Sequence, residues 1–320
     1  MPIQASTIQY PNEMADKIIQ LLMEYRRGIF SEEDKHDHHL DCVAVHFKKI
    51  VCQIKAGKPI LFVLPAFPAK SPNADKTASR LPDLGERLAL QFLDDLCQKI
   101  QLFYPPGALV MICSDGRVFN DLVRVSDAEV DAYAEGIRHI LREDSLMRIM
   151  TFALDDYYGA MPYASMREKL VEDYGESVTL IKAKVKIDQA ANQLFNGIHR
   201  FIYEDQLSIY LSLSKNQIKI LTKKIAYHVI QRSNAWSCFV EKQFPDAVRL
   251  SIHPQLCGSE KLGIMLLKSR DVWATPWHRV VLYDGKEHKL VRKAEAEQMG
   301  ATPVFAKEQF SHYVLGDMES

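Results

Sequence analysis

Pro59-Ile-Leu-Phe-Val-Leu64 and Ala108-Leu-Val-Met-Ile-Cys113 are two short, continuous apolar runs, and each is followed at once by proline or polar sequence. Runs of this length without alternation are typical of strands buried on both faces, as in a parallel sheet. The segment from Asp83 to Leu102 between them has the apolar spacing of a helix. The order strand, helix, strand predicts a βαβ unit with parallel strands.

The same alternation continues on both sides of this unit. Residues 12–30 and 39–55 have helical spacing, and residues 147–152 read as a third strand. Ser126 and Glu129 form a capping-box pattern, which predicts a helix from there to about Leu141. We therefore expect an α/β, Rossmann-like fold with a mostly parallel sheet flanked by helices.

The pattern changes to helix throughout between Asp155 and Gln243, with capping boxes expected at Ser165/Glu168 and Ser214/Gln217. Strand patterns return at residues 247–252, 262–267 and 280–283. We therefore divide the chain into the first part of an α/β core (1–154), a helical insertion or subdomain (155–245), and the completion of the sheet together with a C-terminal segment (246–320).

Composition limits the class of protein. The 320 residues are 47% hydrophobic and 25% charged, which is ordinary for a globular protein, and the formal net charge of -1 argues against general binding to nucleic acid. No run reaches the roughly 18 apolar residues of a membrane span, and no signal-peptide pattern opens the chain. Six scattered cysteines without a Cys-x-x-Cys pair argue against a disulfide framework or zinc ribbon, and we expect a cytoplasmic protein.

Ligands of an open parallel sheet collect beyond the carboxyl ends of its strands. The loop after the first strand carries Lys70 and Lys76 around the rigid Ser71-Pro-Asn73 segment, with Arg80 close behind. These cations predict a site for a phosphorylated ligand. Lysines in surface loops are more often only solvated, so that interpretation stays open.

Further candidate residues lie in loops that follow predicted strands. Ser114-Asp-Gly-Arg117 places a carboxylate beside a guanidinium, although Asp115-Gly116 alone would be an ordinary turn. His253, held by Pro254, is a candidate general acid or base, or a structural histidine. Trp277-His278-Arg279 is a second candidate group, or the edge of a surface strand.

Other motifs are weak or missing. His36-Asp-His-His39 has the spacing of metal ligands, but no further ligand cluster supports it, and a solvated segment is the simpler interpretation. The chain has no Gly-x-Gly-x-x-Gly, phosphate-loop, His-Glu-x-x-His or Gly-x-Ser-x-Gly motif. Dinucleotide dehydrogenases, kinases, zinc proteases and serine hydrolases are therefore not expected.

Three motifs, in this order, resemble those of the pyoverdine/dityrosine biosynthesis family: Phe67-Pro-Ala-Lys-Ser-Pro-Asn73 with Lys76, Ser114-Asp-Gly-Arg-Val-Phe119, and Arg249-Leu-Ser-Ile-His-Pro254. The resemblance covers about residues 50–279. It implies an isonitrile (isocyanide) synthase, a carbon–carbon lyase-type enzyme of secondary-metabolite biosynthesis. Such enzymes join the amino nitrogen of L-tyrosine or L-tryptophan to a carbon of ribulose 5-phosphate. The resemblance also implies no metal or redox cofactor in the synthase, and a partner oxygenase that depends on iron(II) and 2-oxoglutarate.

This chemistry suggests a role for each candidate residue. We expect Asp115 and His253 to transfer protons, and Arg117 or Arg249 to bind the carboxylate of the amino acid. The remaining predicted substrate-binding residues are the phosphate clamp Lys70, Lys76 and Arg80, the aromatic wall Phe67 and Trp277, and the polar residues Ser71, Asn73 and Ser114.

Two alternatives remain open from the sequence. One is a dityrosine-type enzyme, in which the tyrosine nitrogen ends as a formamide, and the other is a non-catalytic protein that binds a sugar phosphate. The choice between tyrosine and tryptophan is also open, because the pocket walls come from helices that the sequence does not place.

Overall fold

A computed structural model describes residues 4–28, 39–207, 209–210 and 212–316. Its main sheet has five strands in the order β3-β2-β1-β4-β5, and every neighbouring pair is parallel. The strands are β1 (Ile60–Pro65), β2 (Ala108–Cys113), β3 (Ile149–Phe152), β4 (Val248–Ser251) and β5 (Leu262–Gly263). The predicted α/β class with a mostly parallel sheet is confirmed, although β5 is much shorter than the apolar run at 262–267.

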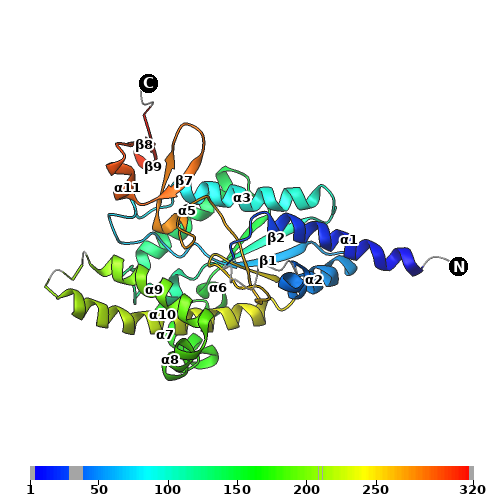
Figure 1. Ribbon diagram of the computed structural model, residues 1–320, viewed down its shortest axis with the longest axis horizontal. Coiled ribbons are helices and arrows are strands. Elements are labelled where there is room, and N and C mark those ends of the chain that lie inside the picture. The colour runs from blue at the N-terminus through cyan, green and yellow to red at the C-terminus, as the bar shows by residue number, and fades with distance from the viewer. Residues whose placement is uncertain (1–3, 29–38, 208, 211, 317–320) are drawn as a thin grey trace.

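Helices cover both faces of this sheet (Figure 1). Phe62 and Leu64 of β1 face one core, whereas Val63 faces the other. The first core is formed with α1 (Gln4–Met23), α2 (His39–Lys55), α3 (Leu84–Gln101) and α5 (Asp127–Glu143). Because successive side chains of a strand point to opposite faces, a strand between two helical layers must be apolar throughout, as the sequence of β1 is.

The helix starts follow from local hydrogen bonds. Ser126 and Ser214 make the predicted capping boxes with Glu129 and Gln217, at the starts of α5 and α10 (Lys215–Gln243). The capping box predicted at Ser165 is wrong, because α7 (Tyr163–Tyr174) begins after Pro162 and already includes that serine. Proline suits a helix start, since its missing N–H would have no helical partner there.

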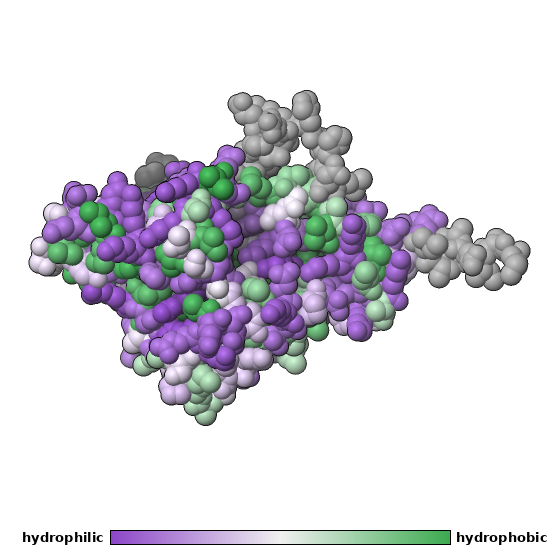
Figure 2. Space-filling model, turned by 90° about the horizontal axis from the view of Figure 1, so that it is seen from below, coloured by the Kyte–Doolittle hydropathy of each residue, from purple (hydrophilic) through white to green (hydrophobic). Residues whose placement is uncertain are grey.

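The segment between β3 and β4 is helical, as expected. Its helices are α6 (Leu154–Tyr158), α7, α8 (Val178–Ile187), α9 (Gln189–Leu207) and α10. Helices α6, α7 and α10 lie against the second face of the sheet, while α8, α9 and α10 share a small core of their own around Phe195, Ile202 and Ile230. The face seen from below in Figure 2 is mostly hydrophilic, with hydrophobic residues scattered in small groups.

Part of the C-terminal segment completes the main sheet. Only β4 and β5 do so, and the rest forms a second sheet in the order β7-β6-β9-β8. Its elements are β6 (Val280–Tyr283), β7 (His288–Val291), α11 (Lys293–Gln298), β8 (Thr302–Ala306) and β9 (Gln309–Val314). The pairing partners of β6, which are β7 and β9, lie later in the chain, so the apolar pattern of β6 alone could not identify its sheet.

A disulfide joins Cys42 of α2 to Cys257, in the loop after β4. The sequence argued against a disulfide framework and did not identify this single pair, because residues 215 positions apart in sequence form no recognisable cysteine pattern. None of the described helices is long and apolar enough to cross a membrane. The His36-Asp-His-His39 motif lies outside the residues whose side chains are described.

The loops that follow β1 and β2 meet at Gly116. A Cβ atom at this position would overlap the carbonyl oxygen of Pro68. Gly116 is also the first residue of the short helix α4 (Gly116–Phe119). Only glycine permits this approach of two backbones, which brings two of the motifs in the sequence to one place.

We predict that Gly116→Ala destabilises the protein by about 1–3 kcal/mol, because the added methyl group forces the two loops apart. Urea unfolding followed by circular dichroism measures this change. Gly316→Ala is the matched control, since a Cβ there meets no atom within 4 Å. Equal stability of the two variants would show that the contact between the loops is not tight.

Candidate active site

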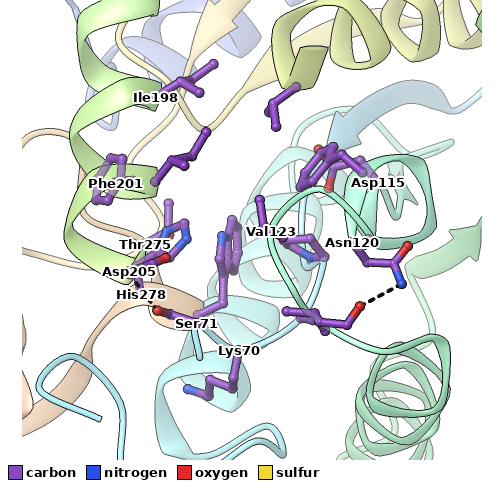
Figure 3. Close-up of a pocket in the computed structure, with 18 of the residues that line it drawn as sticks. Lys70, Ser71, Asp115, Asn120, Val123, Ile198, Phe201, Asp205, Thr275 and His278 are labelled. Atoms are coloured by element: carbon purple, nitrogen blue, oxygen red, sulfur yellow. Dashed lines mark hydrogen bonds between the residues drawn. The ribbon is translucent and has the colours of Figure 1, made fainter. Parts of the chain in front are cut away.

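A hollow that is partly open to solvent lies beyond the carboxyl ends of β1, β2 and β4. In Figure 3, Ile198, Phe201 and Asp205 of α9 face Asp115 and Asn120 across it. Helix α9 therefore forms one wall, and the loop after β2 forms the wall opposite. We call this space the first hollow.

Asp115 is the carboxylate at the end of β2. It precedes α4, and its Oδ1 atom is buried without a hydrogen-bond partner among the described residues. Burial raises the pKa of Asp115 to about 7. A carboxyl group with this pKa is present in both protonation states near neutral pH, which suits a group that exchanges protons.

His253 follows β4 and borders the same hollow. Burial, together with the charge of Arg27, lowers the pKa of His253 to about 4, so the imidazole is neutral at pH 7. Its Nδ1 atom has no partner among the residues described. Arg27 holds the backbone here, because its Nη1 donates to the Ile252 carbonyl at 2.6 Å.

A second hollow of about 760 Å³ adjoins the first. Both are bordered by Asp115 and His253, and also by Ile198, Ser233 and Ile252. Residues that border only the second hollow include Ser251, Gln255 and Lys261. The two predicted proton-transfer residues therefore lie at the junction of two spaces, each of which has its own walls.

Lys70 does not present its ammonium group to the first hollow. Its Nζ lies 2.7 Å from Asp83 Oδ2 and 2.8 Å from Glu86 Oε2, and it also donates to the Pro276 carbonyl. Burial opposes a charge here, but the two carboxylates outweigh it and raise the pKa of Lys70. Figure 3 shows the side chain directed away from the hollow.

Lys76 and Arg80 are also engaged elsewhere. The Nζ of Lys76 lies 2.6 Å from Asp205 Oδ1 and 3.0 Å from Glu204 Oε2, and the side chain is buried. Arg80 donates to the Ser71 carbonyl at 2.9 Å and is half-exposed. The geometry does not favour the predicted phosphate clamp. Lys70 holds the loop to α3, Lys76 holds it to α9, and Arg80 lies 3.6 Å from Glu129 of α5.

The two arginines proposed for the carboxylate lie outside the first hollow. Arg117 forms ion pairs with Asp131 and Asp155, and its guanidinium lies 3.8 Å from the centre of the Tyr163 ring. Arg249 is paired with Glu241 at 2.7 Å. The geometry does not support their predicted role, because each guanidinium already has an acceptor and neither borders that space.

Trp277 borders the first hollow, as predicted for an aromatic wall. Phe67 does not, but it packs behind Trp277 with ring centres 5.1 Å apart. Phe201 and Trp273 complete the wall, and His278 stacks on Phe201 at 4.9 Å. The first hollow is thus largely aromatic on one side, which suits a flat ring of a ligand.

The polar residues of the loops mainly hold the backbone. Ser71 borders the first hollow, and its Oγ donates to Asp205 Oδ1 at 3.0 Å. Asn73 donates to the Glu204 carbonyl, and the Oγ of Ser114 donates to the Phe67 carbonyl at 3.1 Å. Ser114 and Asn73 therefore support the site without bordering it.

Sequence reasoning missed the contribution of α9. Asp205 is buried beside Ser71 and Lys76, and burial raises its pKa against the opposing effect of Lys76. Phe201 and Ile198 of the same helix border the first hollow. These residues belong to no recognised motif. They lie in the segment that the sequence predicts to be a helical insertion, so the sequence does not place them beside the strand ends.

We predict that Lys70→Met destabilises the protein by about 3–5 kcal/mol, because it leaves two buried carboxylates without a counter-charge. Urea unfolding measures this loss, and Lys58→Met is a control at an exposed lysine. A variant of normal stability that binds sugar phosphates poorly would instead support the original clamp assignment.

Comparison with known proteins agrees with this fold. The sequence pattern of the family described as pyoverdine/dityrosine biosynthesis protein matches residues 50–304. An L-tryptophan isonitrile synthase of Fischerella ambigua is 43% identical over 302 residues, which are 94% of this chain and 92% of that protein. An L-tyrosine isonitrile synthase of Pseudomonas aeruginosa is 40% identical over 307 residues, with 93% of each chain covered.

A solved structure extends the match to three dimensions. The crystal structure of the PvcA protein from Pseudomonas aeruginosa superposes with a TM-score of 0.89 at 39% identity, and covers 94% of this chain and 99% of that one. The resemblance noted in the three motifs is thus confirmed over nearly the whole chain, and the protein belongs to the pyoverdine/dityrosine biosynthesis family.

Proposed function

We propose that the protein is an isonitrile synthase that uses L-tyrosine or L-tryptophan as the nitrogen source and ribulose 5-phosphate as the carbon donor. The observation that carries this proposal is the placement of Asp115 and His253. They come from different strand ends, border the same two hollows, and each has a buried atom without a partner in the described part of the chain.

The walls of the first hollow fit the amino acid. Trp277, Trp273 and Phe201 supply flat apolar surface that a phenol or indole ring can pack against. An aromatic ring placed there leaves the amino group free to reach the junction between the hollows. The relatives named for tyrosine and for tryptophan support an aromatic substrate without choosing between the two.

The junction supplies the proton transfers that the reaction needs. When an amine condenses with a ketone, a C–N bond forms, two protons leave the nitrogen, and the ketone oxygen departs as water. A carboxylate with a raised pKa accepts such protons, and a neutral imidazole accepts a proton and, once charged, returns it. We assign these roles to Asp115 and His253. The product would then pass to an oxygenase that depends on iron(II) and 2-oxoglutarate, as the family resemblance implies.

We predict that the purified protein, given L-tyrosine or L-tryptophan with ribulose 5-phosphate, forms a product with the isonitrile stretch in its infrared spectrum. Formation should require both substrates. A formamide product would favour the dityrosine-type reaction, and binding of ribulose 5-phosphate without any turnover would favour a non-catalytic role. Either result would contradict the isonitrile synthase proposal.

We predict that Asp115→Asn lowers kcat about 100-fold or more, because the amide cannot accept a proton. For the unaltered protein, kcat/KM should rise with pH through about 7, since only the ionised carboxyl group acts as a base. His253, with its pKa near 4, stays neutral over this range.

The control for this variant is Asp95→Asn, which alters an exposed carboxylate of α3. It should keep both the rate and the pH profile. A profile that is unchanged in Asp115→Asn would show that another group is the base.

A further inference from the structure

We propose that Lys261, with the hydroxyl groups of Ser251 and Ser237, binds the phosphate of the sugar phosphate in the second hollow. This inference rests on the proposed function, since it assigns one of the two substrates to a subsite. All three residues border the second hollow and not the first. This subsite replaces the loop of Lys70 and Lys76 as the predicted phosphate site.

Lys261 differs from the other cations of the site in its partners. Lys70 and Lys76 each contact two carboxylates, and Arg249 is paired with Glu241. The ammonium group of Lys261 makes no hydrogen bond or ion pair within residues 4–28, 39–207, 209–210 and 212–316. An anion can therefore bind it without displacing a carboxylate of the protein.

The serine hydroxyls offer hydrogen-bond donors of the right kind. The Oγ of Ser251 accepts from the His253 N–H and from Gln255 Nε2, both at 3.1 Å. The Oγ of Ser237 accepts from Arg249 Nη2 at 2.6 Å. Because each oxygen already accepts, its own proton is free, and neither proton has an acceptor among the described residues. A phosphate, whose oxygens are strong acceptors, satisfies both.

The electrostatics of Lys261 are those of a cation that lacks its counter-ion. Burial, and then the nearby charge of Arg249, lower the pKa of Lys261 to about 8, so it remains mostly charged at pH 7. Glu241 and Glu260 oppose this shift, but neither borders the second hollow, and both lie within 4 Å of Arg249. A dianion in the hollow would favour the charged lysine.

Asp115 is the carboxylate among the described residues that border the second hollow. Its position indicates where in that hollow the phosphate binds. Asp115 borders both hollows, whereas Lys261 borders only the second. A phosphate at Lys261 therefore lies in the second hollow, where the charge of Lys261 also contributes to the lowered pKa of His253, and the carbon skeleton extends from it toward Asp115 and His253. The ketone then meets the amino group of a substrate held in the first hollow.

Lys261→Met tests this subsite, and Lys261→Arg tests whether the charge is what matters. We expect the methionine variant to raise KM for ribulose 5-phosphate about 10- to 100-fold, as the loss of a charged hydrogen bond implies, with KM for the amino acid little changed. The arginine variant should recover most of the affinity. Lys58→Met, at an exposed lysine, is the control.

Calorimetry without amino acid separates this inference from the proposed function. It measures the binding of ribulose 5-phosphate, of ribulose and of inorganic phosphate. Phosphate-dependent binding that is lost in Lys261→Met supports the subsite even if no isonitrile forms. Normal turnover by Lys261→Met with unchanged KM values overturns the subsite while the function stands. Trapping of the sugar on Lys261 by borohydride would also overturn it, because the lysine would then react with the ketone.

Discussion

The buried ammonium group of Lys70 is the contact on which the geometry of the site depends. It lies between Asp83 and Glu86, which together cap the start of α3, and it also donates to the carbonyl of Pro276. The phenol of Tyr133 on α5 donates to the other oxygen of Glu86. One lysine therefore joins the loop after β1 to two helices and to the turn that carries Trp277. Such a network tolerates little rearrangement, because each charge is buried and relies on the others.

The same physical effect, burial, gives the two candidate proton-transfer groups opposite properties. It disfavours charge on both Asp115 and His253, so the pKa of the carboxyl group rises and that of the imidazole falls. A carboxyl group near its midpoint and a neutral ring then border the same two hollows. Enzymes commonly set acid and base roles by separating pKa values in this way.

Cations near the site divide according to whether the protein supplies their counter-charge. Lys70 and Lys76 are paired with carboxylates and serve the structure, whereas the partly buried charge of Lys261 has no such partner in the described chain. Residue type alone cannot separate these cases. Lys70 and Lys76 flank a proline-containing segment at a strand end, as the lysines of a phosphate clamp would, but their ion pairs hold this loop to α3 and α9.

The sequence by itself determined the local features: the buried strands β1 and β2, the starts of α3, α5 and α10, the family resemblance, and the positions of Asp115, His253 and Trp277 beside a crevice. Apolar periodicity and capping act over a few residues, so these could be read directly. Only the tertiary structure decided which charges meet, because Lys76 is 129 positions from Asp205. It likewise decided the disulfide, the second sheet and the wall formed by α9, since these contacts join segments far apart in the chain.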